Sequence, residues 1–563
     1  MISHLKSLHL HTDERRAVLR EAITSDVGLF MSVAATLKEF GQWICGDCMK
    51  LHALSRSCHH PDGLIKFIDG ADDISMHIVG IPKPLPNEPK ADLNDGLVMD
   101  AQLLDRVFKL PITTVKSIPH NCRMAFSQAL KAALSKVVAH PGSVETWVAL
   151  LILPRCTLQV FRPKNRQEMR YGNRKSLQHC NILSALATWG TEDGIAKLVK
   201  NLVDNARLEQ QDKKEEYIQE KRTPGSTNVR QCLRKVADGH FTAAVKVLCS
   251  SGVAPFGGDT TKALEDKHPY KPPPSMPNTI FSEPPLVVDV DNVLGGIKSF
   301  PKGTSCGRDG LRAQHILDAL CGEGSAIAKD LLRAITSVVN LWLGGRCPSS
   351  LAEFVASAPL TPLLKPDKGI RPIAVGTIWR RLVSKLAMKG VGKEMAKYLN
   401  DFHFGVGVSG GVEAILHSAN RLLSERHDDK SLSMLTVDFS NAFNLVDRSA
   451  LLHEVRLRCP SISLWVEFLY GQAARLYLGN THIRSSTGVQ QGDPLGPLLF
   501  AIVLHPLLHK IRDNCKLLLH AWYLDDGTLI GDSEEVAKAL DIITVIGPKL
   551  GLQLNIKKTE LFW

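Results

Sequence analysis

The sequence predicts an α+β fold with an antiparallel sheet in its C-terminal half, preceded by a mainly helical N-terminal region. A β-rich run ends at Asp438, and two further apolar runs, 517–523 and 528–530, flank the adjacent Asp525 and Asp526. Two apolar runs joined by a short polar turn are the pattern of a β-hairpin. Helical periodicity lies between these strands, which yields the order strand, helix, hairpin, helix, strand. That order favours one sheet covered by helices.

The composition indicates an intracellular globular protein with a polyanionic partner. The 563 residues are 44% hydrophobic and 22% charged, enough for several domains with cores of their own. The net charge of +11 favours nucleic acid as a partner. No apolar run reaches the roughly 18 residues of a membrane span, so we expect no membrane partner. Thirteen scattered cysteines indicate reduced thiols. The sequence distinguishes neither nucleus from cytoplasm nor one oligomeric state from another.

Asp438, Asp525 and Asp526 are candidate metal ligands. Two adjacent carboxylates at a hairpin tip repel each other, and each is costly to desolvate. Alone, such a pair is more often a solvated turn. A third acid at the end of a neighbouring strand changes the interpretation, because three carboxylates can hold two Mg²⁺ ions. Such ions lie roughly 3.5–4 Å apart in two-metal phosphoryl transfer.

Five ordered segments carry a resemblance to a known family. They are 365–373 (Lys-Pro-Asp-Lys-Gly-Ile-Arg-Pro-Ile), 438–443 (Asp-Phe-Ser-Asn-Ala-Phe), 488–497 (Gly-Val-Gln-Gln-Gly-Asp-Pro-Leu-Gly-Pro), 523–526 (Tyr-Leu-Asp-Asp) and 551–559 (Gly-Leu-Gln-Leu-Asn-Ile-Lys-Lys-Thr). In order and spacing the chain resembles the reverse transcriptases of non-LTR (LINE-type) retrotransposons. The resemblance implies a right-hand polymerase with fingers and palm, and an RNA-directed DNA polymerase that takes an RNA template, a DNA primer and dNTPs. It also implies Asp438, Asp525 and Asp526 as catalytic residues that bind two Mg²⁺ ions.

The same resemblance implies a set of nucleotide-binding residues: Lys365, Arg371, Phe443, Gln491, Gly492 and Lys557. Lys365 and Arg371 flank a predicted hairpin tip from which they could reach a triphosphate, the alternative being an ordinary charged hairpin. Gln491 corresponds to the Gln that contacts the nucleotide, and Gly492 lets the backbone approach a base pair or sugar. Lys557 would protonate or neutralise the leaving pyrophosphate.

Phe443 stands five residues after Asp438, where the family carries a bulky aromatic ring. A ring against the sugar C2′ excludes a 2′-hydroxyl and selects deoxynucleotides. On periodicity alone, a core Phe is the simpler interpretation. Residues 299–311 form a Gly-rich turn before a helix and resemble the family's pre-fingers motif. Such a turn can present N–H groups to phosphate.

The chain divides into three predicted regions. Residues 1–80 hold a candidate zinc knuckle at 45–60; residues 90–270 are mainly helical and basic, followed by a linker at 271–284; residues 285–563 are the fingers and palm. The sequence ends shortly after the fifth segment, so we expect the thumb to be absent. Residues 552–556 are predicted to be the last strand of the palm.

The candidate zinc ligands are Cys45, Cys48, His52 and Cys58. The first two have the spacing that lets two thiolates reach one tetrahedral Zn²⁺. The His of a knuckle would fall at position 53, which is Ala, so His52 stands one place away. A reduced Cys cluster in a loop is the open alternative.

Three further alternatives remain on the sequence alone. The basic segment 161–175 is either an arm that binds a nucleic-acid backbone or a solvated loop. The whole chain could be a catalytically inactive remnant that binds nucleic acid. An RNA-directed RNA polymerase shares the metal chemistry, but Phe443 speaks against it because a smaller or polar residue is expected there.

Overall fold

The computed structural model describes residues 42–44, 51–53, 98–162, 174–216, 224–237, 239–321, 327–367 and 369–563. The chain forms two compact units, Met1–Leu97 and Val98–Trp563. In the first unit, β1 (Gln42–Ile44) pairs with β2 (Leu51–Ala53) in antiparallel register. Everything described below belongs to the second unit.

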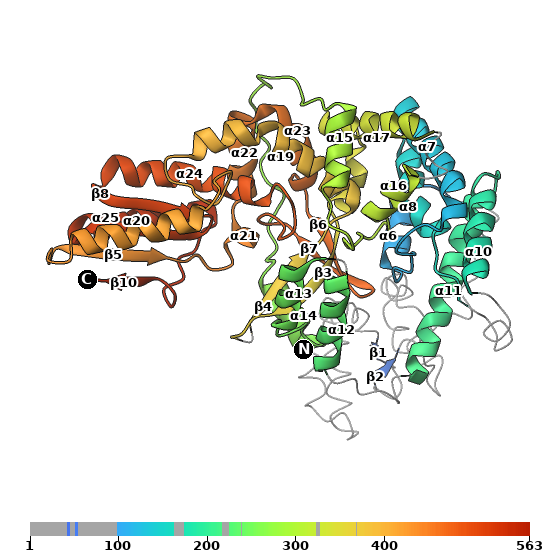
Figure 1. Cartoon of the computed structure of the whole chain (residues 1–563), viewed down its shortest axis with the longest axis horizontal. Helices are drawn as coiled ribbons and strands as arrows, with labels where there is room; N and C mark the ends of the chain where they lie inside the picture. Colours follow the sequence, from blue (N-terminus) through green and yellow to red (C-terminus); the bar gives the residue numbers. More distant parts are fainter. Residues whose placement is uncertain are drawn as a thin grey trace, which may run out of the picture. The chain divides into compact units, whose positions relative to one another are not determined.

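A four-stranded antiparallel sheet forms the palm (Figure 1). Its order is β10 (Glu560–Phe562), β5 (Leu432–Val437), β9 (Asp526–Asp532) and β8 (Leu517–Tyr523). In β5 the buried residues alternate with half-buried ones, as expected of a strand with one face on the core. Helix α25 (Ser533–Ile546) packs on β5 and β9, and α20 (Gly411–Glu425) packs against β8. The predicted antiparallel palm sheet is confirmed.

A second four-stranded sheet carries the fingers hairpin. Its order is β4 (Ile370–Ala374), β3 (Ala358–Leu364), β6 (Ala474–Leu478) and β7 (Thr481–Ser485). Strands β3 and β6 are parallel, with Ala358 opposite Leu476, and this pairing joins two hairpins that are far apart in sequence. Leu264, on α14 (Gly258–Asp266), is buried in the core of this sheet.

Helices surround both sheets. The described helices up to residue 270 are α6 (Ala101–Lys109), α7 (Arg123–Ala139), α8 (Val144–Thr157), α10 (Arg174–Trp189), α11 (Gly194–Glu216), α12 (Pro224–Ala237), α13 (Phe241–Leu248) and α14. Later ones are α15 (Val290–Lys298), α16 (Ala313–Ala319), α17 (Ala328–Leu343), α18 (Ala352–Val355), α19 (Ile378–Leu399), α20, α21 (Ala442–Leu445), α22 (Arg448–Arg458), α23 (Ser463–Tyr470), α24 (Gly496–Asn514) and α25. Short 3₁₀ turns occur at His120–Cys122, Ser349–Leu351, Pro460–Ile462 and Gly547–Leu550.

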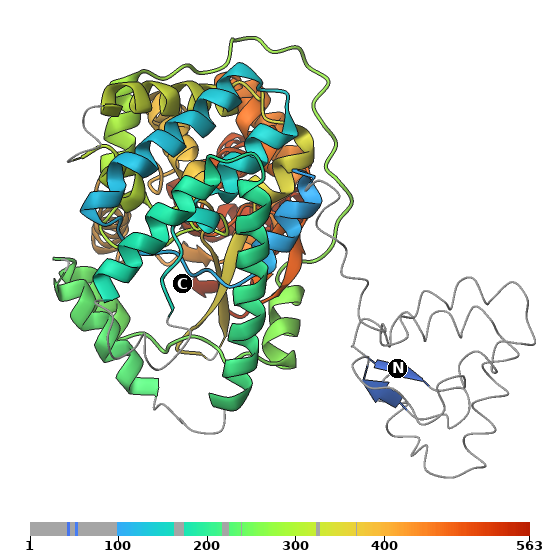
Figure 2. The ribbon, with the colours of Figure 1, turned by 90° about the vertical axis from the view of Figure 1, so that its right-hand side faces the viewer.

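The early and late helices share one core. Figure 2 shows α7, α8, α10 and α11 together on the side that lies away from the palm in Figure 1. A column of three buried indoles crosses this core: the Trp147 and Trp342 rings are 4.9 Å apart, and Trp342 and Trp379 are 5.6 Å apart. These side chains come from α8, α17 and α19. Because helices from both sides of residues 271–284 share this core, the predicted boundary between a helical region and the fingers and palm stays a prediction from sequence.

One predicted strand is wrong. Residues 552–556 do not form a strand; Leu554 makes only an isolated bridge to Phe439, and β10 takes the palm edge instead. Strand β3 begins at Ala358, shortly after α18 ends at Val355. Among the helices of the described residues, none combines the length and apolar character that crossing a membrane requires.

A buried ion pair anchors the turn before α24. Arg380 Nη2 lies 2.7 Å from Asp493 Oδ2, and both side chains are almost fully buried. The Tyr470 hydroxyl donates to the same oxygen at 2.7 Å, and Arg380 Nη1 donates to the Ala356 carbonyl at 2.8 Å. Burial and the Asp493 charge raise the pKa of Tyr470, so the phenol stays protonated. The N-cap residue of α24 is Leu495.

Removing one charge of this pair should destabilise the protein strongly. We expect Asp493→Asn to lower the free energy of unfolding by about 3–5 kcal/mol, because Arg380 would stay buried without its counter-charge. Urea unfolding measures the change. The matched control is Glu425→Gln, which breaks the exposed Arg421–Glu425 pair and should leave the free energy of unfolding nearly unchanged. Equal effects of the two variants would contradict the interpretation.

Candidate active site

The register of the palm sheet brings three carboxylates together. Val437 pairs with Gly527, so Asp438 and Asp526 come next on adjacent strands. Tyr523 pairs with Asp526, which leaves Leu524 and Asp525 as a two-residue turn. The predicted hairpin tip is thus present, with Asp525 in the turn and Asp526 as the first residue of β9.

These carboxylates act on one another electrostatically. Burial, together with the charges of Asp526 and Asp438, raises the pKa of Asp525 to about 6, whereas Arg371 opposes the shift. Burial and the Asp438 charge also raise the pKa of Asp526, and Lys558 opposes this. Like charges held together in this way disfavour ionisation unless a cation lies between them. The donor set, three carboxylates, is the kind that Mg²⁺ prefers.

Asp438 is oriented by a neighbour. Asn555 Nδ2 donates to Asp438 Oδ2 at 2.6 Å, and the Asn555 backbone N–H donates to the Asp438 carbonyl at 2.8 Å. Among the residues that the structure describes, no three His, Cys, Asp or Glu side chains stand close enough to hold a metal ion as placed. The three carboxylates therefore lie close enough to influence one another's pKa, but as placed they are too far apart to coordinate one metal ion together.

Backbone strain marks both sides of this site. Within the described ranges, the non-glycine residues with positive φ are Asn441 (52°), shortly after Asp438, and Leu524 (60°), in the hairpin turn. Such conformations cost of order 1–3 kcal/mol each and persist only when their surroundings enforce them. Asn441 is tied by its Nδ2, which donates to the Lys267 carbonyl at 2.8 Å.

The segment after α19 supports the hairpin. The backbone N–H of Phe404 donates to the Trp522 carbonyl, and that of Trp522 donates to the Phe402 carbonyl, both at 2.8 Å. Gly405 then lies under the turn: a Cβ at this position would meet Leu524 Cγ at 2.8 Å and Leu524 N at 3.0 Å. The glycine therefore permits the close approach that positions the tip.

Four imidazoles, those of His403, His505, His509 and His520, gather at β8, and His520 is a residue of that strand. His403 and His505 are fully buried, and the Nε2 atoms of His505 and His509 are 2.8 Å apart. Burial lowers the pKa of His403 to about 3, and those of His505 and His520 to about 4. The imidazoles also lower one another's pKa, so at neutral pH these side chains are uncharged.

Of the two nucleotide-binding residues predicted at the fingers hairpin, Arg371 lies within electrostatic reach of the acids. Arg371 pairs with Leu363 across the fingers hairpin, and its charge acts on Asp525. The Lys365 backbone N–H donates to the Gly369 carbonyl at 2.8 Å, which closes the tip. Their roles toward a nucleotide stay predictions.

Gly492 is required by a contact inside the protein. Its φ is 134°, and a Cβ would meet the Ala374 carbonyl oxygen at 2.4 Å. The Gln491 carbonyl accepts from the Ala374 N–H at 2.9 Å, so this loop extends the fingers sheet. The glycine is explained by strand β4 without a nucleotide.

Phe443 has both a core contact and a partly exposed side. Its ring stacks on Phe500 with the centroids 4.8 Å apart and the planes 10° apart. Phe500, on α24, is fully buried, whereas Phe443 is only half-buried. Its role in sugar selection stays a prediction.

Sequence reasoning missed two cations at this site. Lys558, adjacent to the predicted Lys557, acts on both Asp526 and Asp367. Lys267 follows α14. Burial is the main cause that lowers its pKa, and the positive charges of Lys365 and Lys558 lower it further. Lys558 lies within the fifth motif, but no local signal pointed to Lys267.

The Gly-rich turn does not present its full length to solvent. Arg308, Asp309 and Gly310 are buried, whereas residues 301–303 are exposed, so the expectation that the turn presents N–H groups to phosphate stays a prediction for its first part alone. Instead, Thr114 Oγ1 donates to the Gly310 carbonyl at 2.9 Å, and Arg155 Nη1 donates to the Arg308 carbonyl at 3.2 Å. The turn ties the early helices to the fingers.

The remaining candidates lie outside the described residues. Cys45, Cys48 and Cys58 are among them, and for His52 only the backbone of β2 is described. Most of the basic segment 161–175 also falls there. Zinc binding by the Cys cluster stays a prediction.

Three acids at adjacent strand ends of an antiparallel sheet, beside a fingers hairpin, define a polymerase palm. Residues 363–563 match the family model described as reverse transcriptase (RNA-dependent DNA polymerase). The predicted resemblance is confirmed: this segment is a reverse transcriptase domain of the non-LTR retrotransposon type.

Three curated proteins show the same relationship. The chain is 29% identical over 301 residues to the retrotransposable element SLACS 132 kDa protein of Trypanosoma brucei gambiense, covering 50% of this chain and 24% of that one. It is 32% identical over 135 residues to a putative 115 kDa protein in the type-1 retrotransposable element R1DM of Drosophila melanogaster (22% and 13%). It is 24% identical over 235 residues to a Pol polyprotein from element R2 of Nasonia vitripennis (40% and 22%). The chain spans at most about a quarter of these relatives.

A similar solved structure is an apo telomerase from Candida tropicalis truncated from its C-terminal domain. It is 14% identical, with a TM-score of 0.28, and the match covers 48% of this chain and 71% of that one. At this TM-score the likeness carries no weight for the site.

Acid should destabilise the protein through the buried imidazoles. Their pKa values are lower in the folded than in the unfolded state, so unfolding takes up protons below about pH 6.5, and stability falls as the pH falls toward 4. Each contributes up to about 1.4 kcal/mol per pH unit. We expect His403→Phe to reduce the pH slope of the unfolding free energy by about one proton, measured by urea unfolding at pH 7.0 and 5.5. His417→Phe, at an exposed position, is the control, and the same slope in both variants would contradict the assignment.

Gly405→Ala should displace the hairpin tip. The new Cβ would press on Leu524, and an error of about 1 Å in a catalytic group can cost on the order of 100-fold in rate. We expect a large loss of primer extension with little change in melting temperature. Gly258→Ala, where a Cβ meets nothing within 4 Å, is the matched control. Full activity of the Gly405 variant would show that this glycine does not position the site.

Proposed function

We propose that the chain acts as an RNA-directed DNA polymerase, in which the 3′-hydroxyl of a DNA primer paired to an RNA template attacks the α-phosphate of a dNTP. The observation that carries this proposal is the electrostatic repulsion among the carboxylates of Asp438, Asp525 and Asp526, which lie together at the ends of the palm strands. The reverse transcriptase family generally uses Mg²⁺. Bound by these carboxylates, two Mg²⁺ ions would lower the pKa of the attacking hydroxyl and neutralise the departing pyrophosphate.

The chain's own side chains supply positioning and charge. Asn555 holds the Asp438 carboxylate in one orientation through its 2.6 Å hydrogen bond. Lys558 and Arg371 already act on Asp526 and Asp525, respectively, and would hold the triphosphate from the fingers and the segment before β10. Lys365 and Lys557 would add charge on the same side. Their positive charge compensates the negative charge that develops on the leaving oxygen.

Selection of substrate would fall to Phe443 and the loop before α24. The Phe443 ring is held by its stacking on Phe500, so it could press against the sugar C2′ and exclude ribonucleotides. Gln491 is half-buried beside Ala374 and would contact the nucleotide by its amide. A non-catalytic protein that binds nucleic acid is the competing proposal, favoured by the absence of a closed ligand set among the described residues.

Primer extension separates the two proposals. The purified chain is given an RNA template, a DNA primer, dNTPs and Mg²⁺. Asp525→Asn should reduce extension by on the order of 100-fold or more. The matched control is Asp541→Asn, the same change at an exposed position of α25. No extension by the unaltered chain, together with RNA binding that Asp525→Asn leaves unchanged, would favour the non-catalytic protein.

Metal binding has a readout that does not need activity. Because the folded state raises the pKa of Asp525 to about 6, its ionisation costs stability as the pH rises from about 4 to 6. In EDTA at pH 7, Asp525→Asn should therefore be more stable than the unaltered chain by about 1–2 kcal/mol, a figure reduced for partial exposure. Added Mg²⁺ should raise the melting temperature of the unaltered chain and not that of the variant. Equal shifts in both would place the metal elsewhere.

A further inference from the structure

Two helices that precede the fingers in the sequence carry an exposed apolar surface. They are α12, which ends at Ala237, and α13, which begins at Phe241, and they pack on each other (Figure 1). Gly239, at a φ of 79°, lies between them, and the His240 N–H donates to the Lys235 carbonyl at 2.8 Å. A left-handed glycine with such a bond commonly ends a helix, so the second helix begins directly beside the first.

The exposed apolar side chains follow the helical repeat on both helices. On each helix they stand at positions i, i+4 and i+7, which share one face. Their exposed fractions run from 43% for Val236 to 67% for Phe241. Single exposed apolar residues are ordinary, but a group of this size marks an interaction site. The six side chains, which we call the α12–α13 face, are Val229, Leu233, Val236, Phe241, Val245 and Leu248.

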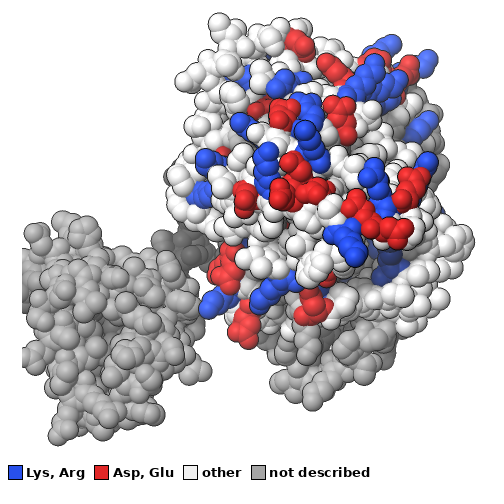
Figure 3. Space-filling model, turned by 90° about the vertical axis from the view of Figure 1, so that its left-hand side faces the viewer, with Lys and Arg blue, Asp and Glu red and all other residues white. Residues whose placement is uncertain are grey.

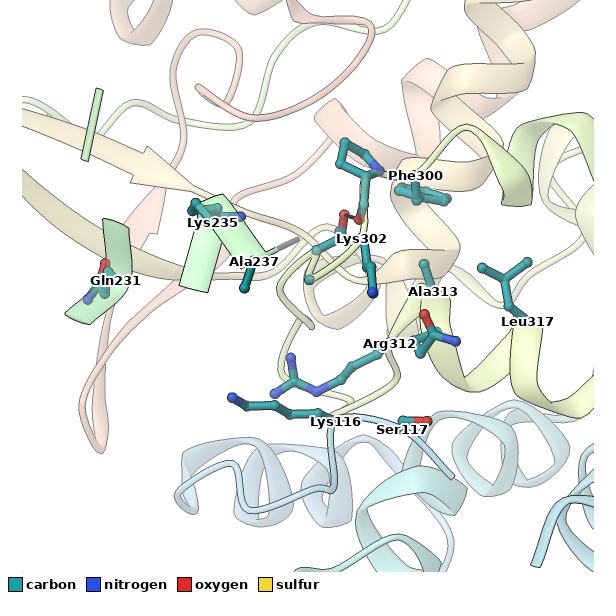
Figure 4. Close-up of a pocket in the computed structure, with 14 residues that line it drawn as sticks. Lys116, Ser117, Gln231, Lys235, Ala237, Phe300, Lys302, Arg312, Ala313 and Leu317 are labelled. Carbon is teal, nitrogen blue, oxygen red and sulfur yellow. Dashed lines mark hydrogen bonds between the residues drawn. The ribbon is translucent and has the colours of Figure 1, made fainter. Parts of the chain in front are cut away.

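Other sides of the two helices are used inside the protein. Figure 4 shows Gln231 and Lys235 on α12 and Lys302 on the loop 300–304, and all three line one cavity. On α13, Ala244 is buried, and just before this helix the Nε2 atom of His240 lies 3.2 Å from the Lys302 carbonyl oxygen. These contacts hold the helix pair on the fingers and do not use the α12–α13 face.

The helix pair is anchored to the fingers sheet. After α13 the chain runs along β3, where the Ala254 N–H donates to the Pro362 carbonyl at 2.8 Å and the Leu364 N–H donates to the Gly252 carbonyl at 3.0 Å. Val253 and Leu363 form an antiparallel bridge at the same place. A surface that is held by a sheet keeps its geometry, which lowers the entropy cost of binding a partner.

Cations flank the α12–α13 face. Arg230 follows Val229 and Lys246 follows Val245, and both cations are exposed. Neither α12 nor α13 contains Asp or Glu. Figure 3 shows a different pattern at the palm end of the molecule, where Lys and Arg alternate with Asp and Glu. An apolar face with cationic edges is complementary to an apolar face with acidic edges.

This chemistry favours one occupant over the others. A second copy of the chain would place cations against cations, which opposes association. A nucleic-acid strand would meet the cations, but five of the six apolar side chains are aliphatic and offer no ring on which a base could stack. Two adjacent helices with stripes at i, i+4 and i+7 are instead suited to an amphipathic helix, whose own apolar stripe covers them.

We propose that the α12–α13 face docks an amphipathic helix of another protein that carries acidic residues beside its apolar stripe. Burial of the six apolar side chains drives the association, and the cations select an acidic partner. The face lies outside residues 363–563, which match the reverse transcriptase model, and none of its residues belongs to the carboxylate site. A partner would therefore be held by the chain without occupying the candidate active site.

The test measures binding of a synthetic peptide to the full chain by fluorescence anisotropy. The probe is a labelled peptide of about 16 residues, with Leu at helical spacing and Glu on both flanks. Two control peptides accompany it: one carries Lys in place of Glu, and the other has the same residues in scrambled order. Melting temperatures confirm that each variant of the chain is folded.

The first variant, Leu233→Gln with Val245→Gln, removes apolar surface from both helices. The matched control, Leu416→Gln with Val545→Gln, makes the same changes at exposed positions of α20 and α25. We expect the α12–α13 variant to bind the Glu peptide on the order of tenfold more weakly than the control, because apolar surface is no longer buried there. Equal affinities of the two variants would overturn the proposal.

The second variant, Arg230→Gln with Lys246→Gln, tests the cationic edges. Its control is Lys393→Gln with Lys538→Gln, at exposed positions of α19 and α25. The variant should bind the Glu peptide about threefold more weakly than its control at low salt, and the difference should vanish at high salt because exposed charges are screened. Binding of the Lys peptide or the scrambled peptide as tightly as the Glu peptide would contradict selection of an acidic helix.

The same variants identify any other occupant. A dimer of the unaltered chain in sedimentation that Leu233→Gln with Val245→Gln dissociates would assign the face to a second copy. RNA binding, or binding to phosphatidylserine vesicles, that this variant loses and its control keeps would assign the face to nucleic acid or lipid. Each of these results, with the Glu peptide unbound, would overturn the proposal.

This test is independent of the proposed polymerase function. The variants keep Asp438, Asp525 and Asp526, so their melting temperatures should still rise with Mg²⁺ as in the unaltered chain. Weaker peptide binding with that rise retained assigns the defect to the α12–α13 face. Failure of the Mg²⁺ response in the unaltered chain itself would count against the polymerase and leave the peptide result standing.

Discussion

Repulsion among three carboxylates is the constraint around which the palm is built. Nothing in the chemistry of Asp438, Asp525 and Asp526 draws them together without a cation, so the surrounding structure must hold them. The β5–β9 register supplies one part of that force, and the tight turn at Leu524 supplies another. The strained backbone at this turn persists because Gly405 leaves room for it and because residues 402–404 pair with Trp522. Stability from ordinary packing is thus used to maintain an arrangement that is unfavourable by itself.

The early helices belong to the same structural unit as the polymerase core. Arg155 and Arg308 are buried side by side, and burial lowers the pKa of each to about 10. Backbone carbonyls, rather than carboxylates, satisfy most of their donors: Arg155 Nη2 donates to the Pro111 carbonyl at 2.9 Å, and Arg308 Nε donates to that of Phe108. Several hydrogen bonds to fixed backbone carbonyls hold each guanidinium in one orientation. The turn at 306–311 therefore sets the orientation in which the early helices pack on the fingers.

Local patterns in the sequence were sufficient to predict the elements that carry the site. The ends of β5 and of the β8–β9 hairpin followed from apolar runs that stop at acids, and these runs are short and contiguous. Contacts between distant segments could not be predicted in this way. The parallel pairing of β3 with β6 joins residues more than a hundred positions apart, and Lys267 reaches the site only because α14 packs on the fingers sheet. Gly492 illustrates the same point: a close approach to a nucleotide was expected there, but the neighbour that requires a glycine, Ala374, lies on a strand of the fingers sheet.

The indole column has a spectroscopic consequence. The chain has eight tryptophans, and Trp147, Trp342 and Trp379 lie in contact within one core, with tilted rings and no exposure beyond 1%. Trp522, by contrast, belongs to strand β8 of the palm hairpin, and its ring stacks on Phe439 with the centroids 5.9 Å apart. Emission from the column reports on the junction of early helices and fingers, whereas emission from Trp522 reports on the palm. Single Trp→Phe replacements would therefore divide the intrinsic fluorescence of this protein into two local probes, one for each half of the molecule.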